Sequence, residues 1–129
     1  MTGLQLHNLS FQRQGFSLDV STSLAKGSKT LLVGASGAGK STLLSLIGGF
    51  LTPKQGVILW NGEDMTKLPP QMRPLTLLFQ DHNLFPHLTV WNNVALGLKP
   101  SLKLTVDEKE KIQSILNKVG VYPLKERYP

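Results

Sequence analysis

The chain has 129 residues, of which 40% are hydrophobic and 17% are charged, and its net charge is +6. This length suits one domain or part of a larger one, and the composition excludes a chain that is disordered throughout. Cysteine is absent, which excludes disulfide frameworks and thiolate metal sites. The basic residues are scattered and no basic run is interleaved with aromatic residues, so we expect no nucleic-acid partner.

The sequence gives no sign of a segment that crosses a membrane by itself. The longest apolar run, residues 43–51, is far shorter than the ~20 residues that span a bilayer. The first ten residues lack the basic and then apolar pattern of a signal peptide. We therefore expect any association with a membrane to depend on a partner.

The first half of the chain predicts strands, turns and one helix. Residues 4–11 and 15–24 alternate apolar and polar side chains, which is typical of half-buried strands, with Gly15 as the turn between them. The apolar run at residues 30–33 predicts a buried parallel strand. A helix is expected from Lys40 to about Gly48, followed by a strand at residues 57–60 and a turn at Asn61-Gly62.

The second half begins with another predicted buried strand, residues 75–80, and then becomes helical. Thr89 is the expected N-cap of a short helix, and Thr105 with Glu108 forms a capping-box pattern that opens a second helix. Gly120 is the expected end of that helix. One apolar face is predicted for the second helix, made of Ile112, Ile115, Leu116 and Val119.

Residues 34–41 match the phosphate-binding pattern G-x-x-x-x-G-K-[ST]. Glycines permit backbone angles that point successive N–H groups at an anion, and the helix that follows adds its positive N-terminal end. We expect Lys40 to contact the β- and γ-phosphates, and the Ser41 hydroxyl to bind Mg²⁺. The alternative is a glycine-rich turn without a ligand. The predicted nucleotide-binding residues are Gly34, Ala35, Ser36, Gly37, Ala38, Gly39, Lys40, Ser41 and Thr42.

The residues around and after this motif resemble the nucleotide-binding subunits of ABC transporters. In that family the phosphate motif is followed by P-x-x-G-x-[IV]-x-x-x-G, whose fixed positions fall on Pro53, Gly56 and Gly62. The resemblance covers essentially the whole chain. It implies an α/β fold of the P-loop NTPase class, an ABC-type nucleotide-binding domain. The expected parts are an antiparallel β subdomain, the P-loop strand and helix, the glutamine loop and the start of the helical subdomain.

A second stretch, LTLLFQDHNLFPHLTVWNNVALGL at residues 75–98, resembles the glutamine loop of the same family. The resemblance implies that Gln80 is the loop glutamine, that its side-chain oxygen binds Mg²⁺, and that it acts in catalysis together with Lys40. Residues 83–88 would then lie near the coupling helix of a transmembrane permease subunit. Taken alone, Gln80 would be a polar strand end that faces water.

One position departs from the family pattern. The family usually places an aromatic residue near the N-terminus, where it stacks on adenine, and here that position falls on Arg13. A guanidinium can also stack on a ring, so Arg13 is included in the predicted nucleotide site. Phe11 or Phe16 could take this role if the loop shifts, and packing in the core is the alternative for both.

The resemblance implies a transport ATPase, a translocase that couples ATP hydrolysis to the import of a small solute. Residues 73–104 resemble the ATP-binding subunits of bacterial thiamine importers in particular, so thiamine is the expected solute, with iron or polyamine as alternatives. The implied partners are the permease, a second ATPase subunit in a homodimer and, indirectly, a periplasmic solute-binding protein. The implied location is peripheral, on the cytoplasmic face of the bacterial inner membrane.

The family's LSGGQ signature, its strand ending in Asp-Glu and its late switch histidine do not occur in the sequence. We therefore expect residues 1–129 to form a partial ABC ATPase domain that ends before the signature motif. Hydrolysis of ATP by these residues alone should be negligible. A non-catalytic fragment and a P-loop kinase of small metabolites remain alternatives, although Arg13, Arg73 and Arg127 are too widely spaced for the arginine-rich lid of such a kinase.

Overall fold

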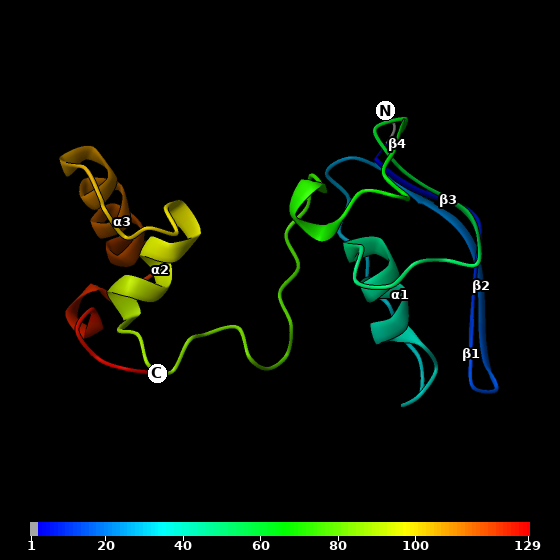
Figure 1. Ribbon diagram of the computed structural model, residues 1–129, viewed down its shortest axis with the longest axis horizontal. Helices are drawn as coiled ribbons and strands as arrows, with labels where there is room; N and C mark the ends of the chain where they lie inside the picture. The colour runs from blue at the N-terminus through cyan, green and yellow to red at the C-terminus, as the bar shows by residue number, and fades with distance from the viewer. Residues whose placement is uncertain (1–2) are drawn as a thin grey trace. The chain divides into compact units, whose positions relative to one another are not determined.

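The computed structural model describes residues 3–129, which divide into two compact units, one ending at Leu77 and the other running from Leu78 to Pro129 (Figure 1). In the first unit, four antiparallel strands form one sheet in the order β2-β1-β3-β4. The strands are β1 (Leu4–Arg13), β2 (Phe16–Leu24), β3 (Gln55–Trp60) and β4 (Glu63–Asp64). The antiparallel β subdomain expected from the sequence is therefore confirmed.

Two-residue turns join β1 to β2 and β3 to β4. Gln14 and Gly15 have φ values of +43° and +80°, and Asn61 and Gly62 have values of +51° and +89°. Turns with positive φ at both central residues match the twist of the flanking strands, which is why Asn-Gly is so favourable here. The turns predicted at Gly15 and at Asn61-Gly62 are confirmed.

Helix α1 (Lys40–Gly48) packs against the sheet, beside which it lies in Figure 1. Its Leu43 and Leu46 join Leu4, Leu6, Leu9, Ile58 and Met65 in one buried apolar core. The helix ends at Gly49, whose φ of +81° is the left-handed conformation that glycine adopts without strain. The helix starts at Lys40, as predicted. Because α1 is anchored in the core by Leu43 and Leu46, the end of the preceding loop is held in place as well.

Arg73 is buried and ties the end of α1 to the chain that follows β4. It lies just after the short helix η1 (Pro70–Met72). Its Nη1 donates to the carbonyl oxygens of Leu46 and Ile47 at 2.9 and 2.7 Å, in the last turn of α1. Nε and Nη2 donate to the carbonyl oxygens of Leu68 and Thr66, each at 2.9 Å. A cation at this end of a helix also complements the negative end of its dipole.

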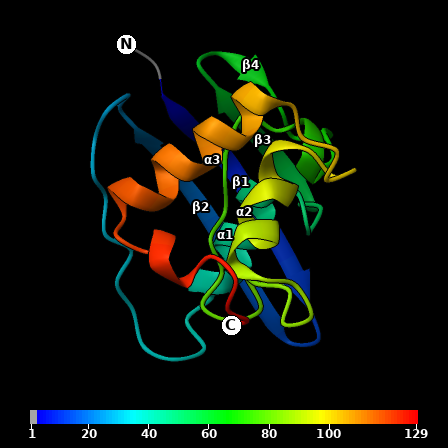
Figure 2. The same ribbon diagram turned by 90° about the vertical axis from the view of Figure 1, so that its left-hand side faces the viewer.

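The second unit contains α2 (Val90–Leu98), α3 (Val106–Lys118) and the short helix η2 (Tyr122–Leu124). Figures 1 and 2 show α2 and α3 side by side, joined by a core of Ala95, Ile112 and Leu116. Thr89 caps α2, and its hydroxyl accepts a hydrogen bond from the Asn92 amide. The predicted capping box of α3 is also present.

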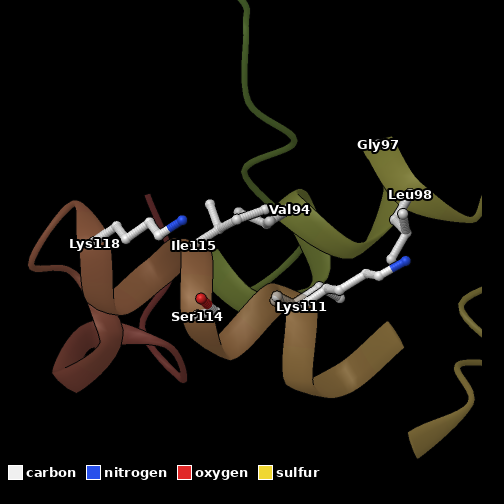
Figure 3. A pocket seen from close by; sticks show the side chains of 8 residues that line it. Val94, Gly97, Leu98, Lys111, Ser114, Ile115 and Lys118 are labelled. Carbon is white, nitrogen blue, oxygen red and sulfur yellow. The ribbon is translucent and has the colours of Figure 1, made fainter. Parts of the chain in front are cut away.

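The apolar face predicted for α3 is only half correct. Ile112 and Leu116 are buried, whereas Ile115 and Val119 are exposed. A hollow of about 400 Å³ lies between α2 and α3. Figure 3 shows Ile115 and Val94 among the side chains that line it. The two-helix contact is narrow, so it covers only one side of the apolar stripe.

Two predicted strands do not form. Residues 30–33 and 75–80 are neither helix nor strand, and among residues 3–129 no strand pairs with either segment. Leu31, Val33 and Leu78 are 85%, 78% and 83% exposed. An isolated extended segment lacks the neighbouring strand that would bond its backbone and cover its side chains, which explains why these apolar runs are not strands here. Within residues 3–129, no helix is both long enough and apolar enough to cross a bilayer.

Candidate functional site

The loop that precedes α1 has the shape of an anion-binding turn. Gly37 and Gly39 have φ values of +81° and +96°, which a residue with a Cβ rarely adopts. The Ala38 amide donates to the Ala35 carbonyl at 3.1 Å and closes a tight turn between them. This alternation of glycines in the left-handed region makes successive backbone amides converge, as in other anion-binding nests.

Lys40 folds back over this loop from the first position of α1. Its ammonium nitrogen donates to the carbonyl oxygens of Gly34 and Ala35 at 2.6 and 2.7 Å. Both contacts are exposed and neutral, so an anionic ligand could compete with them for the same ammonium group. Lys40 therefore holds a positive charge at the loop without a carboxylate partner among the described residues.

A hollow of about 360 Å³ opens at this end of α1. Gly39 is the N-cap and supplies no side-chain cap, and the first turn of α1, all of it described, has no acidic side chain. The first amides of a helix lack partners within the helix, and its N-terminal end attracts anions. The hollow therefore suits a phosphate group. Its lining consists of Phe16, Ser36, Gly37, Gly39, Lys40, Ser41 and Thr42.

The structure brings most of the predicted nucleotide site together. Ser36, Gly37, Gly39, Lys40, Ser41 and Thr42 line the hollow. Gly34 and Ala35 lie under Lys40 as its carbonyl partners. Ala38 fills the space beside Gly34, where an added Cβ would come within 3.2 Å of the Ala38 methyl group.

The hollow is lined by one aromatic residue, Phe16. Arg13, the residue to which the family pattern points, does not line it. Phe16 begins β2 and is paired across the hairpin with Arg13, whose side chain is exposed and is not part of the lining. Phe11 packs against the core of the first unit, in agreement with core packing as the alternative role for this residue. The aromatic ring next to the turn is therefore the one that the fold directs toward the loop.

Gln80 lies in the second unit, on an exposed loop. The next residues along the chain are held by two asparagines, Asn83 and Asn93, neither of which the sequence singles out as a site residue. The Phe79 amide donates to Asn83 Oδ1 at 2.9 Å, and the Phe85 amide donates to Asn93 Oδ1 at 2.7 Å. The roles predicted for Gln80 and Arg13 remain predictions.

A family profile described as "ABC transporter" matches residues 18–129, which includes the glycine loop, α1 and both helices of the second unit. The chain belongs to this family. The antiparallel sheet, α1 and the helices of the second unit agree with the fold that the resemblance implies.

Curated members of this ABC transporter family show the same similarity over nearly the whole chain. The thiamine import ATP-binding protein ThiQ of Jannaschia sp. (strain CCS1) is 45% identical over 126 residues, which is 98% of this chain and 55% of that protein. ThiQ of Haemophilus influenzae (strain ATCC 51907 / DSM 11121 / KW20 / Rd) is 46% identical, covering 98% of this chain and 59% of that protein. The chain thus spans just over half the length of these relatives.

Solved members of the family have the same fold. One ATP-binding cassette of an ABC transporter is 27% identical with a TM-score of 0.85, covering 99% of this chain and 58% of that chain. A nucleotide-free ATP-binding cassette is 28% identical with a TM-score of 0.82, again covering 99% and 58%. These structures confirm the predicted P-loop NTPase fold class of the ABC type.

Proposed function

We propose that this chain is part of the ATP-binding subunit of an ABC importer, and that residues 34–42 bind the phosphates of ATP. The observation that carries the proposal is the hollow at the N-terminus of α1, which combines the left-handed turn at Gly37 and Gly39 with the Lys40 ammonium group. Membership of the ABC transporter family supports ATP as the anion. The relatives are named as ATP-binding proteins of import systems.

Each part of the hollow has a proposed task. The Lys40 ammonium group leaves the Gly34 and Ala35 carbonyls and contacts the β- and γ-phosphates. The Ser41 hydroxyl would bind Mg²⁺, which prefers oxygen ligands, and the family resemblance implies the Gln80 side-chain oxygen as a further ligand. When bound, Mg²⁺ supplies charge neutralisation for phosphoryl transfer. Thr42 donates to a phosphate oxygen from the first turn of α1.

Phe16 is the proposed stacking partner of the adenine base. Its ring lines the hollow, whereas the Arg13 side chain does not. An aromatic ring and a nucleobase stack face to face for about 1–3 kcal/mol, independently of the base sequence. Adenine placed on Phe16 leaves the phosphates in reach of the glycine loop, which lines the same hollow.

The proposed partner of the second unit is the permease subunit of the importer. Leu84 and Phe85, which lie in the stretch 83–88 of this unit, are exposed apolar residues. A run of exposed apolar side chains marks an interaction surface more often than a solvated one. The family's coupling helix is the expected occupant, and the proposed assembly has two ATPase subunits on the cytoplasmic face of the bacterial inner membrane. A periplasmic solute-binding protein would deliver the solute to the permease.

Thiamine is the proposed solute, because relatives at 43–46% identity are named thiamine import ATP-binding proteins. The test is uptake by the assembled transporter in lipid vesicles, with labelled thiamine, ferric iron and a polyamine offered separately. Thiamine uptake that requires ATP and is abolished by Lys40→Ala, but not by Lys54→Ala, is the expected result. Uptake of iron or polyamine in place of thiamine would contradict thiamine as the solute. Uptake that is unaffected by Lys40→Ala would refute the proposed ATP site.

A further inference from the structure

Two asparagines hold the glutamine loop by the same pair of hydrogen bonds. Asn83 Oδ1 accepts from the Phe79 amide at 2.9 Å, while Asn83 Nδ2 donates back to the Phe79 carbonyl. Asn93 Oδ1 accepts from the Phe85 amide at 2.7 Å, while Asn93 Nδ2 donates to the Phe85 carbonyl at 3.1 Å. Each side-chain amide thus imitates a neighbouring strand for one phenylalanine.

The bonds fix a segment that has no regular structure of its own. Residues 79–89, all within the described chain, form neither helix nor strand. Asn93 Nδ2 also lies 3.0 Å from the carbonyl oxygens of Leu88 and Thr89, so it joins the turn at residues 85–88 to the start of α2. Such a segment would otherwise lose its shape, since its backbone groups could bond equally well to water.

The position of Gln80 follows from the Asn83 bonds. Asn83 closes a loop whose ends are Phe79 and Asn83, and Gln80 is the first of the three residues between them. His82 in the same loop has a φ of +60°, which shows how tightly the chain turns there. The two clamped phenylalanines are each about half exposed, at 46% and 51%.

We propose that Asn83 and Asn93 are positioning residues, which fix the backbone at Phe79 and Phe85, and with it the place of Gln80, before nucleotide or permease binds. Preorganisation of this kind reduces the entropy lost when a loop is ordered on binding. The inference rests on the proposed function for the roles of Gln80 and the permease. The hydrogen bonds themselves do not depend on it.

The first measurement is amide exchange by NMR in the complete subunit, without nucleotide or permease. Asn83→Ala removes two hydrogen bonds, so exchange at the Phe79 amide should become about tenfold faster. Asn93→Ala should do the same at Phe85 and leave Phe79 unchanged. Asn83→Asp keeps the acceptor and should give an intermediate rate. Asn92→Ala, at a neighbouring asparagine that is half-buried like Asn93, is the control and should change neither amide.

The second measurement separates positioning from general stability. Permease-stimulated ATP turnover of the assembled transporter is compared for Gln80→Ala, Asn83→Ala and the double variant. If Asn83 acts by placing Gln80, each single change slows turnover and the double variant is no slower than Gln80→Ala alone. MgATP affinity should fall in Asn83→Ala by no more than it falls in Gln80→Ala, because Asn83 acts on the nucleotide only through Gln80.

Two results would overturn the inference: unchanged exchange at Phe79 in Asn83→Ala, or losses of turnover that multiply in the double variant. Failure of the proposed function would appear as a different experimental result. Turnover that does not respond to Gln80→Ala would remove the role of Gln80, and with it the positioning role of Asn83. The exchange rates would still report whether Asn83 and Asn93 hold the loop.

Discussion

The ring of Phe16 lies against the backbone of Gly39, so closely that a Cβ on Gly39 would come within 2.6 Å of the Phe16 Cζ atom. Gly39 is also the N-cap of α1 and has a φ of +96°. One glycine therefore serves two purposes, since it permits the left-handed turn into the helix and leaves room for the aromatic ring. This contact joins the β1–β2 hairpin to the phosphate loop and places the ring at the hollow.

Replacing Gly39 by alanine should cost more than the same change at Gly37. Both residues have positive φ, which costs an L-residue about 1–2 kcal/mol, but a Cβ at Gly37 would meet nothing within 4 Å. Gly39→Ala should therefore lower the free energy of unfolding further than Gly37→Ala, as measured by denaturant titration of the complete subunit. Combining Gly39→Ala with Phe16→Ala should recover part of the loss. Equal losses at the two glycines would contradict this contact.

Phe16 and Arg13 should differ in their effect on nucleotide binding. Phe16→Ala removes the proposed stacking surface and should weaken ATP binding roughly tenfold or more, since base stacking is worth about 1–3 kcal/mol. Binding of inorganic tripolyphosphate, which has no base, should hardly change. Arg13→Ala should alter neither affinity. A loss of ATP affinity in Arg13→Ala but not in Phe16→Ala, measured by calorimetry, would favour Arg13, the position to which the family pattern points.

Arg73 should be among the most sensitive positions for stability. Burial lowers the pKa of its guanidinium below the ordinary value, and the group nevertheless stays charged at neutral pH because arginine does not lose its proton in proteins. Arg73→Met would remove the hydrogen bonds to four buried or partly buried carbonyls in α1 and at residues 66–68, at a cost of about 3 kcal/mol. Chemical unfolding should show this loss, with Arg73→Lys in between and the exposed Arg127→Met as an unaffected control. A loss in Arg73→Met no larger than that in Arg127→Met would argue against the role of these bonds.

The capping box of α3 should make this helix sensitive to acid. A hydrogen bond from the Thr105 amide is the main cause that lowers the pKa of Glu108 below its ordinary value, and Lys99, 3.6 Å away, adds to the shift. A depressed pKa means that the stabilisation is complete above the unfolded-state value and is lost as the pH falls through the folded-state value.

NMR titration of the Glu108 carboxyl carbon and of the α3 amides should show both changes in the same acidic range. Glu108→Gln keeps an acceptor for the Thr105 amide but cannot titrate. In this variant the α3 amide signals should no longer show the pH-dependent change that Glu108 causes. A Glu108 midpoint at or above the ordinary value of 4.5 would contradict the bond to Thr105.

The sequence predicted those elements that depend on close neighbours in the chain. The cap at Thr89, the capping box at Thr105 and Glu108, and the turn at Asn61-Gly62 each involve residues within four positions of one another. The two apolar runs at residues 30–33 and 75–80 were predicted as strands and are not. Their apolar composition indicates that they can be buried. A strand also requires a neighbouring strand to pair with, and the sequence of the run itself does not show whether one is there.

The same distinction applies to the site. The motif at residues 34–42 predicts a phosphate loop, and the structure gathers most of these residues at one hollow because the spacing of glycine, lysine and hydroxyl side chains is fixed by local geometry. Counting residues pointed to Arg13, whereas the register of the hairpin, which pairs Arg13 with Phe16, determines which ring reaches the hollow. Arg73 and Asn83 bond mainly to backbone groups, which any sequence supplies, so no pattern of residue types could identify them.

The most direct test of the central claim is calorimetric titration of the complete subunit with MgATP. The claim is that convergent amides and the Lys40 ammonium group hold the phosphates. Lys40→Ala should weaken binding at least about tenfold, because a charge-assisted hydrogen bond is worth about 1.5–3 kcal/mol. The Lys54 ammonium group bonds to Gln12, and Lys54 does not line the hollow. Lys54→Ala should therefore bind MgATP as tightly as the wild type does. Equal affinity in the wild type and in Lys40→Ala would contradict the assignment.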